Sequence, residues 1–218
     1  MTEVWFVRHG QSSANAGLAT ASSAEVTLTP LGEQQARQVA EAFTQAPDLI
    51  VTSKYTRAIQ TAQFTIERFP GVPVENWDMH EFSYLSPEIM GGGHTTYEQR
   101  RPFAQDYWDR YDPTYIHGPG AESFAQMIGR IETMQAQIRD SRAKFIAIFG
   151  HGMFGKAILW ANLLGSFDVT SEYMRHFHIY IQSFEIPNGG IIKATYTADE
   201  VRFGRIVRAH LTNPGLLA

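Results

Sequence analysis

Short apolar runs along the chain alternate with longer segments in which apolar residues recur every three or four positions. The runs at 4–7, 48–53 and 144–150 are rich in β-branched and aromatic residues, which is typical of strands covered on both faces. A further run, at 73–77, is a candidate third strand. The periodic segments predict helices at 30–46, 54–69, 98–111 and 153–164, and a long one from 122 onward. Strands that alternate with helices indicate an α/β protein with a mostly parallel sheet.

The C-terminal part predicts an antiparallel hairpin at one edge of that sheet. Residues 178–186 and 191–197 have the composition of strands, and Asn188-Gly189 between them is a tight-turn signal. The pattern breaks at about 79–120, which contains three successive glycines and many aromatic residues. We therefore expect one domain over 1–218, a three-layer α/β/α sandwich from which this segment projects as a lid-like excursion.

Composition and charge exclude several classes of protein. The 218 residues are 44% hydrophobic and 18% charged, which suffices for one sizeable core. The chain has no cysteine, so disulfides, thiolate nucleophiles and cysteine-bound zinc are excluded. The net charge of -4 comes without a run of basic residues, which argues against a nucleic-acid surface. No apolar stretch approaches the ~20 residues of a membrane span and no signal-peptide pattern is present, so we expect a cytoplasmic protein without membrane contact.

Basic side chains follow three of the predicted strands. The run at 4–7 leads into Arg8-His9-Gly10, the run at 48–53 into Arg57, and the run at 144–150 into His151. In an open parallel sheet, ligands bind at the carboxyl ends of the strands. If these strands are neighbours, two histidines and two arginines meet at one place.

Such a cluster is suited to a phosphate group. The planar fork of an arginine pairs with phosphate oxygens, and Gly10 lets the backbone approach a ligand closely. Positive charge beside His9 favours its neutral form, and a neutral imidazole nitrogen can take a phosphoryl group covalently. The cations would neutralise the transferred group, while a carboxylic acid protonates the leaving oxygen and then activates water. N–H groups at a helix N-terminus after Ser53 or His151 would add donors for the phosphate.

Four segments in order resemble the histidine phosphatase superfamily, branch 1, which has the phosphoglycerate mutase-like fold. "FVRHGQSSAN" is similar to the family's Arg-His-Gly signature followed by Asn, and "LTPLGEQQA" to the segment that comes next. "VTSKYTRAIQTA" resembles the Ser-x-x-x-Arg-Ala-x-Gln-Thr-Ala segment, and "GHGMF" supplies a second histidine. The order and spacing agree over nearly the whole chain, so the resemblance implies that fold and a phosphoryl-transfer activity.

The resemblance also implies roles for individual residues. His9 becomes the phosphorylated nucleophile, and Glu81 in "MHEFSYL" the acid, although His80 precedes it and the family's glycine-rich continuation is absent. Ser53 is expected to orient His9, and Glu122 in "GPGAES" to line the pocket. The remaining residues implied at the site are Arg8, Gly10, Asn15, Arg57 and His151.

Three functions remain open. A phosphatase hydrolyses the phosphohistidine, a mutase protects it from water, and a non-catalytic relative only binds a phosphorylated ligand. The mutases carry Glu-Arg-x-Tyr-Gly at the acid, which "EFSYL" departs from, so we favour a phosphatase. The expected ligand is a small phosphorylated substrate or inorganic phosphate, with no metal and no other cofactor. An exposed hairpin edge would permit a homodimer.

Two further groups of residues have alternative interpretations. His176 and His178 would share one side of a strand and form half a metal site, but a polar outer face is the preferred interpretation because no third ligand is evident. Arg100 and Arg101 lie in the excursion, where they would bind a second anionic group of the substrate or form a solvated helix face.

Overall fold

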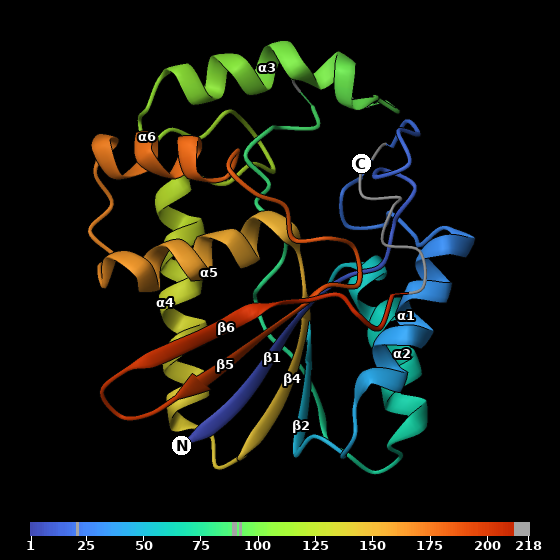
Figure 1. Ribbon diagram of the computed structural model, residues 1–218. Coiled ribbons are helices and arrows are strands. Elements are labelled where there is room, and N and C mark those ends of the chain that lie inside the picture. Colours follow the sequence, from blue (N-terminus) through green and yellow to red (C-terminus); the bar gives the residue numbers. More distant parts are fainter. Residues whose placement is uncertain (21, 89–90, 92, 212–218) are drawn as a thin grey trace.

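The computed structural model describes residues 1–20, 22–88, 91 and 93–211, and it has a six-stranded mixed sheet at its centre (Figure 1). The strand order is β3-β2-β4-β1-β5-β6. Four of these strands are parallel: β1 (Thr2–Arg8), β2 (Leu49–Thr52), β3 (Val74–Asn76) and β4 (Phe145–Gly150). The antiparallel edge consists of β5 (Ile191–Tyr196) and β6 (Val201–Val207). The predicted α/β fold with a mostly parallel sheet and an antiparallel edge is confirmed.

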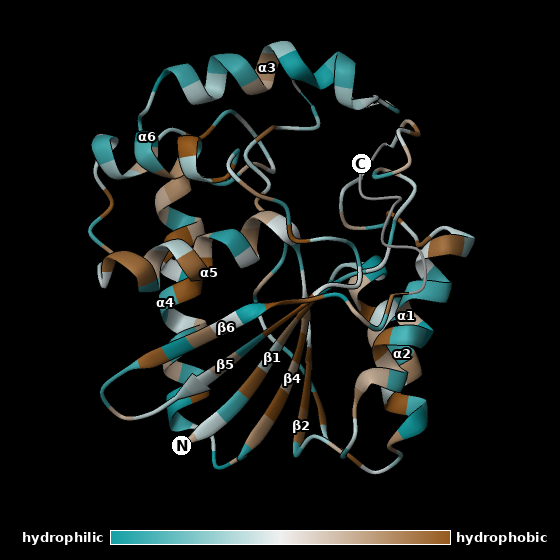
Figure 2. Ribbon diagram, viewed as in Figure 1, coloured by the Kyte–Doolittle hydropathy of each residue, from teal (hydrophilic) through white to brown (hydrophobic). Residues whose placement is uncertain are grey.

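Helices cover both faces of the sheet (Figure 1). One face carries α1 (Pro30–Ala42) and α2 (Thr56–Arg68); the other carries α4 (Phe124–Asp140), α5 (Gly152–Leu164) and α6 (Ser171–Tyr180). Apolar side chains of the strands fill both interfaces, so the sheet is mostly hydrophobic (Figure 2). Helix α3 (Tyr97–Asp109) lies apart from both layers and is mostly hydrophilic. Among the described helices, none combines the length and apolar character needed to cross a membrane.

The strand order brings the predicted site segments together. β4 lies between β1 and β2, so the ends of these three strands are adjacent. The His9 amide donates to the Gly150 carbonyl at 3.0 Å, and the Ser53 amide donates to the Phe149 carbonyl at 3.0 Å. The expectation that these strands are neighbours is confirmed.

The helix that follows the first loop begins as its sequence predicts but ends earlier. The Thr29 hydroxyl accepts a hydrogen bond from the Gly32 amide at 3.1 Å, and Pro30 occupies the first turn, where its missing N–H costs nothing. The helix ends at Ala42 rather than at Pro47, because Phe43 is already extended at φ -76°, ψ 115° and buried against the sheet.

The predicted C-terminal hairpin is wrong in its first strand. Of the predicted strand at 178–186, residues 178–180 end helix α6 and residues 181–186 form neither helix nor strand. The Thr170 hydroxyl caps α6 by accepting from the Tyr173 amide at 3.1 Å. Tyr173, Met174 and Phe177 are buried at helical spacing, so packing on α5 decided against a strand. The antiparallel hairpin is instead formed by β5 and β6.

The Asn188-Gly189 turn does not connect two strands of a hairpin, as its sequence predicts, but contacts the end of β1. Gly189 has φ +72°, as a tight turn requires, but its amide donates to the Arg8 carbonyl at 3.0 Å. The turn therefore fastens the entry to β5 onto the end of β1, next to His9.

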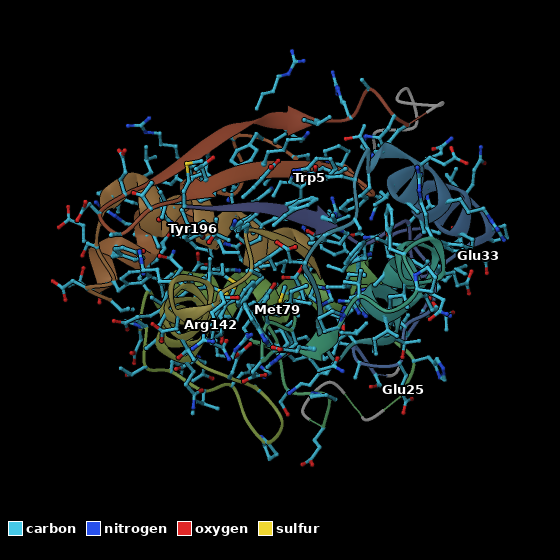
Figure 3. All side chains as sticks on the ribbon, turned by 90° about the horizontal axis from the view of Figure 1, so that it is seen from below. Trp5, Glu25, Glu33, Met79, Arg142 and Tyr196 are labelled. Carbon is cyan, nitrogen blue, oxygen red and sulfur yellow. The ribbon has the colours of Figure 1, made fainter. Side chains whose placement is uncertain are left out.

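The segment between β3 and α4 is buried at its start and again at aromatic residues of α3. Met79 is 2% exposed and lies in the interior, whereas Glu25 and Glu33 lie at the periphery (Figure 3). Further along, Tyr107 and Trp108 on α3 pack against Phe82. The segment is thus anchored by Met79 at its start and by its aromatic residues. Glu81 lies two residues after Met79.

Candidate active site

His9 follows β1 and is 3% exposed. The Arg57 Nε donates to His9 Nε2 at 3.0 Å, and His9 Nδ1 lies 2.7 Å from the Gly10 carbonyl oxygen. An arginine can only donate, so Nε2 carries the lone pair and Nδ1–H donates to that carbonyl. Burial, and then the charges of Arg57 and Arg8, hold the pKa of His9 well below its usual value. His9 is therefore a neutral imidazole whose nucleophilic nitrogen faces a guanidinium.

Arg8 and Arg57 flank this imidazole. Arg57, on the first turn of α2, is 6% exposed and also donates to the Ser23 carbonyl. Arg8 donates from one terminal nitrogen to the Ile186 carbonyl, and among the described residues its Nε has no partner. Burial lowers the pKa of both arginines and the nearby Glu81 carboxylate raises it, but a guanidinium remains charged in proteins. Two cations with unused N–H groups are thus available to an anion.

His151 lies beside His9 at the end of β4, with 5.3 Å between the two ring centroids. Its Nε2 is 2.8 Å from the Ser53 hydroxyl oxygen, and its buried Nδ1 has no partner within the described part of the chain. Burial, followed by the charge of Arg57, holds the pKa of His151 well below its usual value. The expectation that Ser53 orients His9 is not met: Ser53 follows β2, and its hydroxyl pairs with His151 and not with His9.

Glu81 reaches the N-terminus of α5. Its carboxylate accepts from the Phe154 amide at 2.9 Å and from the Met153 amide at 3.1 Å. These two amides are therefore not free to bind a phosphate. The expectation that N–H groups of the helix after His151 bind the phosphate is wrong for the amides of Met153 and Phe154. The helix end instead fixes a carboxylate near Arg8 and Arg57, whose pKa values it raises.

A pocket of about 450 Å³ opens over Arg8, His9, Arg57 and Glu81, whereas His151 is not among the described residues that line it. Its lining includes Arg8, His9, Asn15, Arg57, Glu81 and Arg100. Asn15 is at the pocket, as predicted, where its Oδ1 accepts from the Ser12 hydroxyl at 2.9 Å. The pocket joins two cations and a nucleophile on one side to a carboxylate on the other, which is an arrangement for phosphoryl transfer with proton delivery.

Gly10 has another reason to be glycine than the one predicted. A Cβ at this position would lie 2.3 Å from the Gly32 carbonyl oxygen. The glycine therefore permits a close approach between the loop after β1 and helix α1.

Glu122 is not among the described residues that line this pocket. Its carboxylate pairs with Arg130 at 2.7 Å and accepts from the Ser83 amide at 3.0 Å. The expectation that it lines the pocket is therefore wrong, because its oxygens bind Arg130 and the Ser83 amide instead.

Asn188 is a site residue that the sequence analysis missed. Its amide nitrogen donates to the His9 carbonyl at 3.0 Å and to Asn15 Oδ1 at 3.1 Å. The signal was present, since Asn188 belongs to the tight-turn dipeptide, but only the tertiary structure shows that the turn contacts the loop after β1.

Arg100 and Arg101 have different surroundings. Arg100 lines the pocket and donates to the Thr95 carbonyl at 2.7 Å. Arg101 points to solvent, with its side chain 71% exposed and 3.9 Å from the Glu98 carboxylate. The interpretation as a solvated helix face fits Arg101, whereas Arg100 is placed to meet a ligand.

The other candidate site is not supported. His176 and His178 lie on helix α6, so they do not share a face as residues of a strand would. In the described ranges, no three His, Asp or Glu side chains are grouped so that they could hold a metal ion.

The model of the histidine phosphatase superfamily (branch 1) matches residues 4–207. Phosphoglycerate mutase 1 of Saccharomyces cerevisiae is 27% identical over 190 residues, which cover 71% of this chain and 76% of the yeast protein.

Solved structures with the same fold include several phosphatases. The α-ribazole phosphatase of Shigella flexneri has a TM-score of 0.72 at 20% identity and covers 96% of this chain and 97% of its own. The phosphoserine phosphatase of Entamoeba histolytica, in complex with 3-phosphoglyceric acid, has a TM-score of 0.69 at 20% identity, covering 97% and 100%. A mycobacterial glucosyl-3-phosphoglycerate phosphatase has a TM-score of 0.70 at 22% identity, covering 94% and 98%. At these identities the likeness concerns the fold.

Proposed function

The chain belongs to the histidine phosphatase superfamily (branch 1), and on that premise we propose that it hydrolyses a phosphomonoester through a phosphohistidine on His9. The observation that carries the proposal is the neutral His9 whose Nε2 faces Arg57 at 3.0 Å in a pocket that also holds Glu81. A buried nucleophile beside two cations is what in-line transfer of a phosphoryl group needs.

In the first step, the substrate phosphate takes the place of His9 Nε2 as a partner of the Arg57 guanidinium. The Nε2 lone pair then forms a bond to phosphorus while the bond from phosphorus to the ester oxygen breaks. Arg8, Arg57 and the Nδ1 of His151, which has no partner among the described residues, stabilise the charge on the phosphoryl oxygens. Glu81 protonates the departing oxygen, which then leaves as an alcohol.

In the second step, the same carboxylate accepts a proton from water as the water oxygen attacks phosphorus. The nitrogen–phosphorus bond breaks, inorganic phosphate is released and His9 regains its lone pair. The protein's own side chains supply every charge and proton in this scheme, so we propose activity without a metal ion.

The segment after Glu81 favours hydrolysis over transfer to a second substrate oxygen. In this chain "EFSYL" stands where the mutases carry Glu-Arg-x-Tyr-Gly, so the buried Phe82 takes the place of their arginine. We therefore propose a phosphatase that acts on a small phosphorylated molecule, with residues 79–120 acting as a lid over it. The yeast relative, which is a mutase, makes isomerisation of a phosphorylated hydroxy acid the second candidate.

Hydrolysis of p-nitrophenyl phosphate in excess EDTA, between pH 5 and 8, tests the proposal. Wild-type turnover that survives EDTA and is lost in His9→Ala supports it, provided that both proteins have the same circular dichroism and melting temperature. Residual turnover in a clean His9→Ala preparation would refute the phosphohistidine. If the wild type instead interconverts phosphoglycerate isomers without releasing phosphate, the mutase is correct.

A further inference from the structure

Arg130, in the middle of α4, forms a partly buried ion pair with Glu122 that the proposed chemistry does not use. Its Nε donates to Glu122 Oε2 at 3.0 Å and its second terminal nitrogen donates to Oε1 at 2.7 Å. The two side chains are only 11% and 13% exposed. A buried ion pair adds little stability over an apolar pair because both charges lose water, so its presence calls for a further explanation.

The pair also makes three hydrogen bonds to the main chain around Glu81, and Glu122 Oε1 lies 3.6 Å from the His80 imidazole Nε2. The other terminal nitrogen of Arg130 donates to the Asp78 carbonyl at 3.2 Å and to the His80 carbonyl at 3.0 Å. On the far side of Glu81, the Ser83 amide donates to Glu122 Oε1 at 3.0 Å. The pair therefore holds the backbone both before and after the candidate acid.

Arg130 also contacts the group that Glu81 is fixed to. Its guanidinium carbon lies 5.0 Å from the ring centroid of Phe154. The Phe154 amide is one of the two α5 donors to the Glu81 carboxylate. One cation thus touches both the loop that carries Glu81 and the helix end that receives its carboxylate.

We propose that Arg130 and Glu122 are positioning residues that hold Glu81 at the distance and angle that proton transfer to the leaving oxygen requires. This inference rests on the proposed function of the pocket. Residues 79–83 form neither helix nor strand, so no ladder of backbone bonds fixes Glu81. A misplacement of about 1 Å can cost on the order of 10² in rate, so a dedicated pair has a clear effect.

The test compares Arg130→Met with Arg139→Met on two substrates. Arg139 lies on the same helix and pairs only with Gln135, at 3.3 Å, among the described residues. With an alkyl phosphate, which needs an acid, Arg130→Met should lose on the order of 10² in kcat/KM. With p-nitrophenyl phosphate, whose leaving group departs without a proton, the loss should stay within about threefold. Arg139→Met should match the wild type on both substrates.

Combination with Glu81→Gln separates positioning from general damage. In the double variant, Arg130→Met should add no further loss on the alkyl phosphate, because the acid that it positions is already gone. Losses that multiply, or that are equal on the two substrates, would overturn the inference. Should Arg130→Met fail to fold, Glu122→Gln, which keeps the volume and removes one charge, is judged by the same two criteria.

Hydrogen–deuterium exchange keeps this inference separate from the proposed function. Loss of the pair should speed exchange in peptides covering 79–85 and 151–156 in Arg130→Met, and not in Arg139→Met. If the wild type hydrolyses neither substrate, the phosphatase proposal fails, while faster exchange would still support the positioning of Glu81. Unchanged exchange would overturn it.

Discussion

The two sides of the pocket are built in different ways. Arg8 ends β1, His9 and His151 come directly after β1 and β4, and backbone hydrogen bonds such as His9 N–H to the Gly150 carbonyl at 3.0 Å fix their places. Glu81 and Arg100 come from the segment between β3 and α4, which side-chain contacts hold. In the proposed mechanism, the groups at the strand ends therefore bind and transfer the phosphate, whereas the excursion provides the acid for the leaving group and selects the substrate.

The largest effect should come from the sheet side. Arg57→Ala removes a buried cation and leaves His9 Nε2 without its donor, so kcat/KM should fall by about 10³ for every phosphomonoester. Steady-state kinetics on an aryl and an alkyl phosphate measure this loss, with the exposed Arg37→Ala on α1 as the control. A loss confined to one substrate would place Arg57 on the substrate-selecting side instead.

On the excursion side, Glu81→Gln should separate the two classes of leaving group. The amide cannot deliver a proton, so hydrolysis of an alkyl phosphate should slow by about 10²–10³, while that of p-nitrophenyl phosphate changes little. The exposed Glu88→Gln is the matched control. Equal slowing of both substrates would mean that another group protonates the leaving oxygen.

Arg100→Ala should have a smaller effect that depends on the substrate. Arg100 lines the pocket, so the KM for a phosphate ester with a second anionic group should rise about tenfold. This is roughly the contribution of one charged hydrogen bond. The neighbouring Arg101→Ala, which alters an exposed side chain, should change nothing. A KM for p-nitrophenyl phosphate that rises as much as that of the doubly anionic ester would show that Arg100 binds the transferred phosphate itself.

A separate effect, on stability and not on rate, belongs to the sheet side. Burial lowers the pKa of His9 and His151, so below the usual histidine pKa of about 6.5 the unfolded chain takes up protons that the folded chain does not. The free energy of unfolding should therefore fall as pH decreases from 7 to 5, by up to about 1.4 kcal/mol per pH unit for each histidine. Urea titrations of the wild type and His151→Asn measure it, and an unchanged slope in the variant would contradict the cause.

Much of the architecture could be predicted from local patterns. The buried runs that precede His9 and His151 form β1 and β4, as their continuous apolar sequence predicts. Helix α1 begins at Pro30, as the Thr29-Pro30 capping pattern predicts. Both signals lie in neighbouring residues of the sequence. The helix at 171–180 was missed because its apolar residues also fit a strand, and only packing on α5 distinguishes the two.

The order of residues along the chain was enough to predict that Arg8, His9, Arg57 and His151 lie near one another in one candidate site, because they come at or soon after the ends of predicted strands. The tertiary structure alone decided the pairings within that site. Ser53 bonds His151 across 98 positions of sequence, Glu81 caps α5, and Glu122 turns away from the pocket to Arg130. Such contacts depend on strand order and on the path of a loop without regular structure, and neither is encoded in the spacing of neighbouring residues.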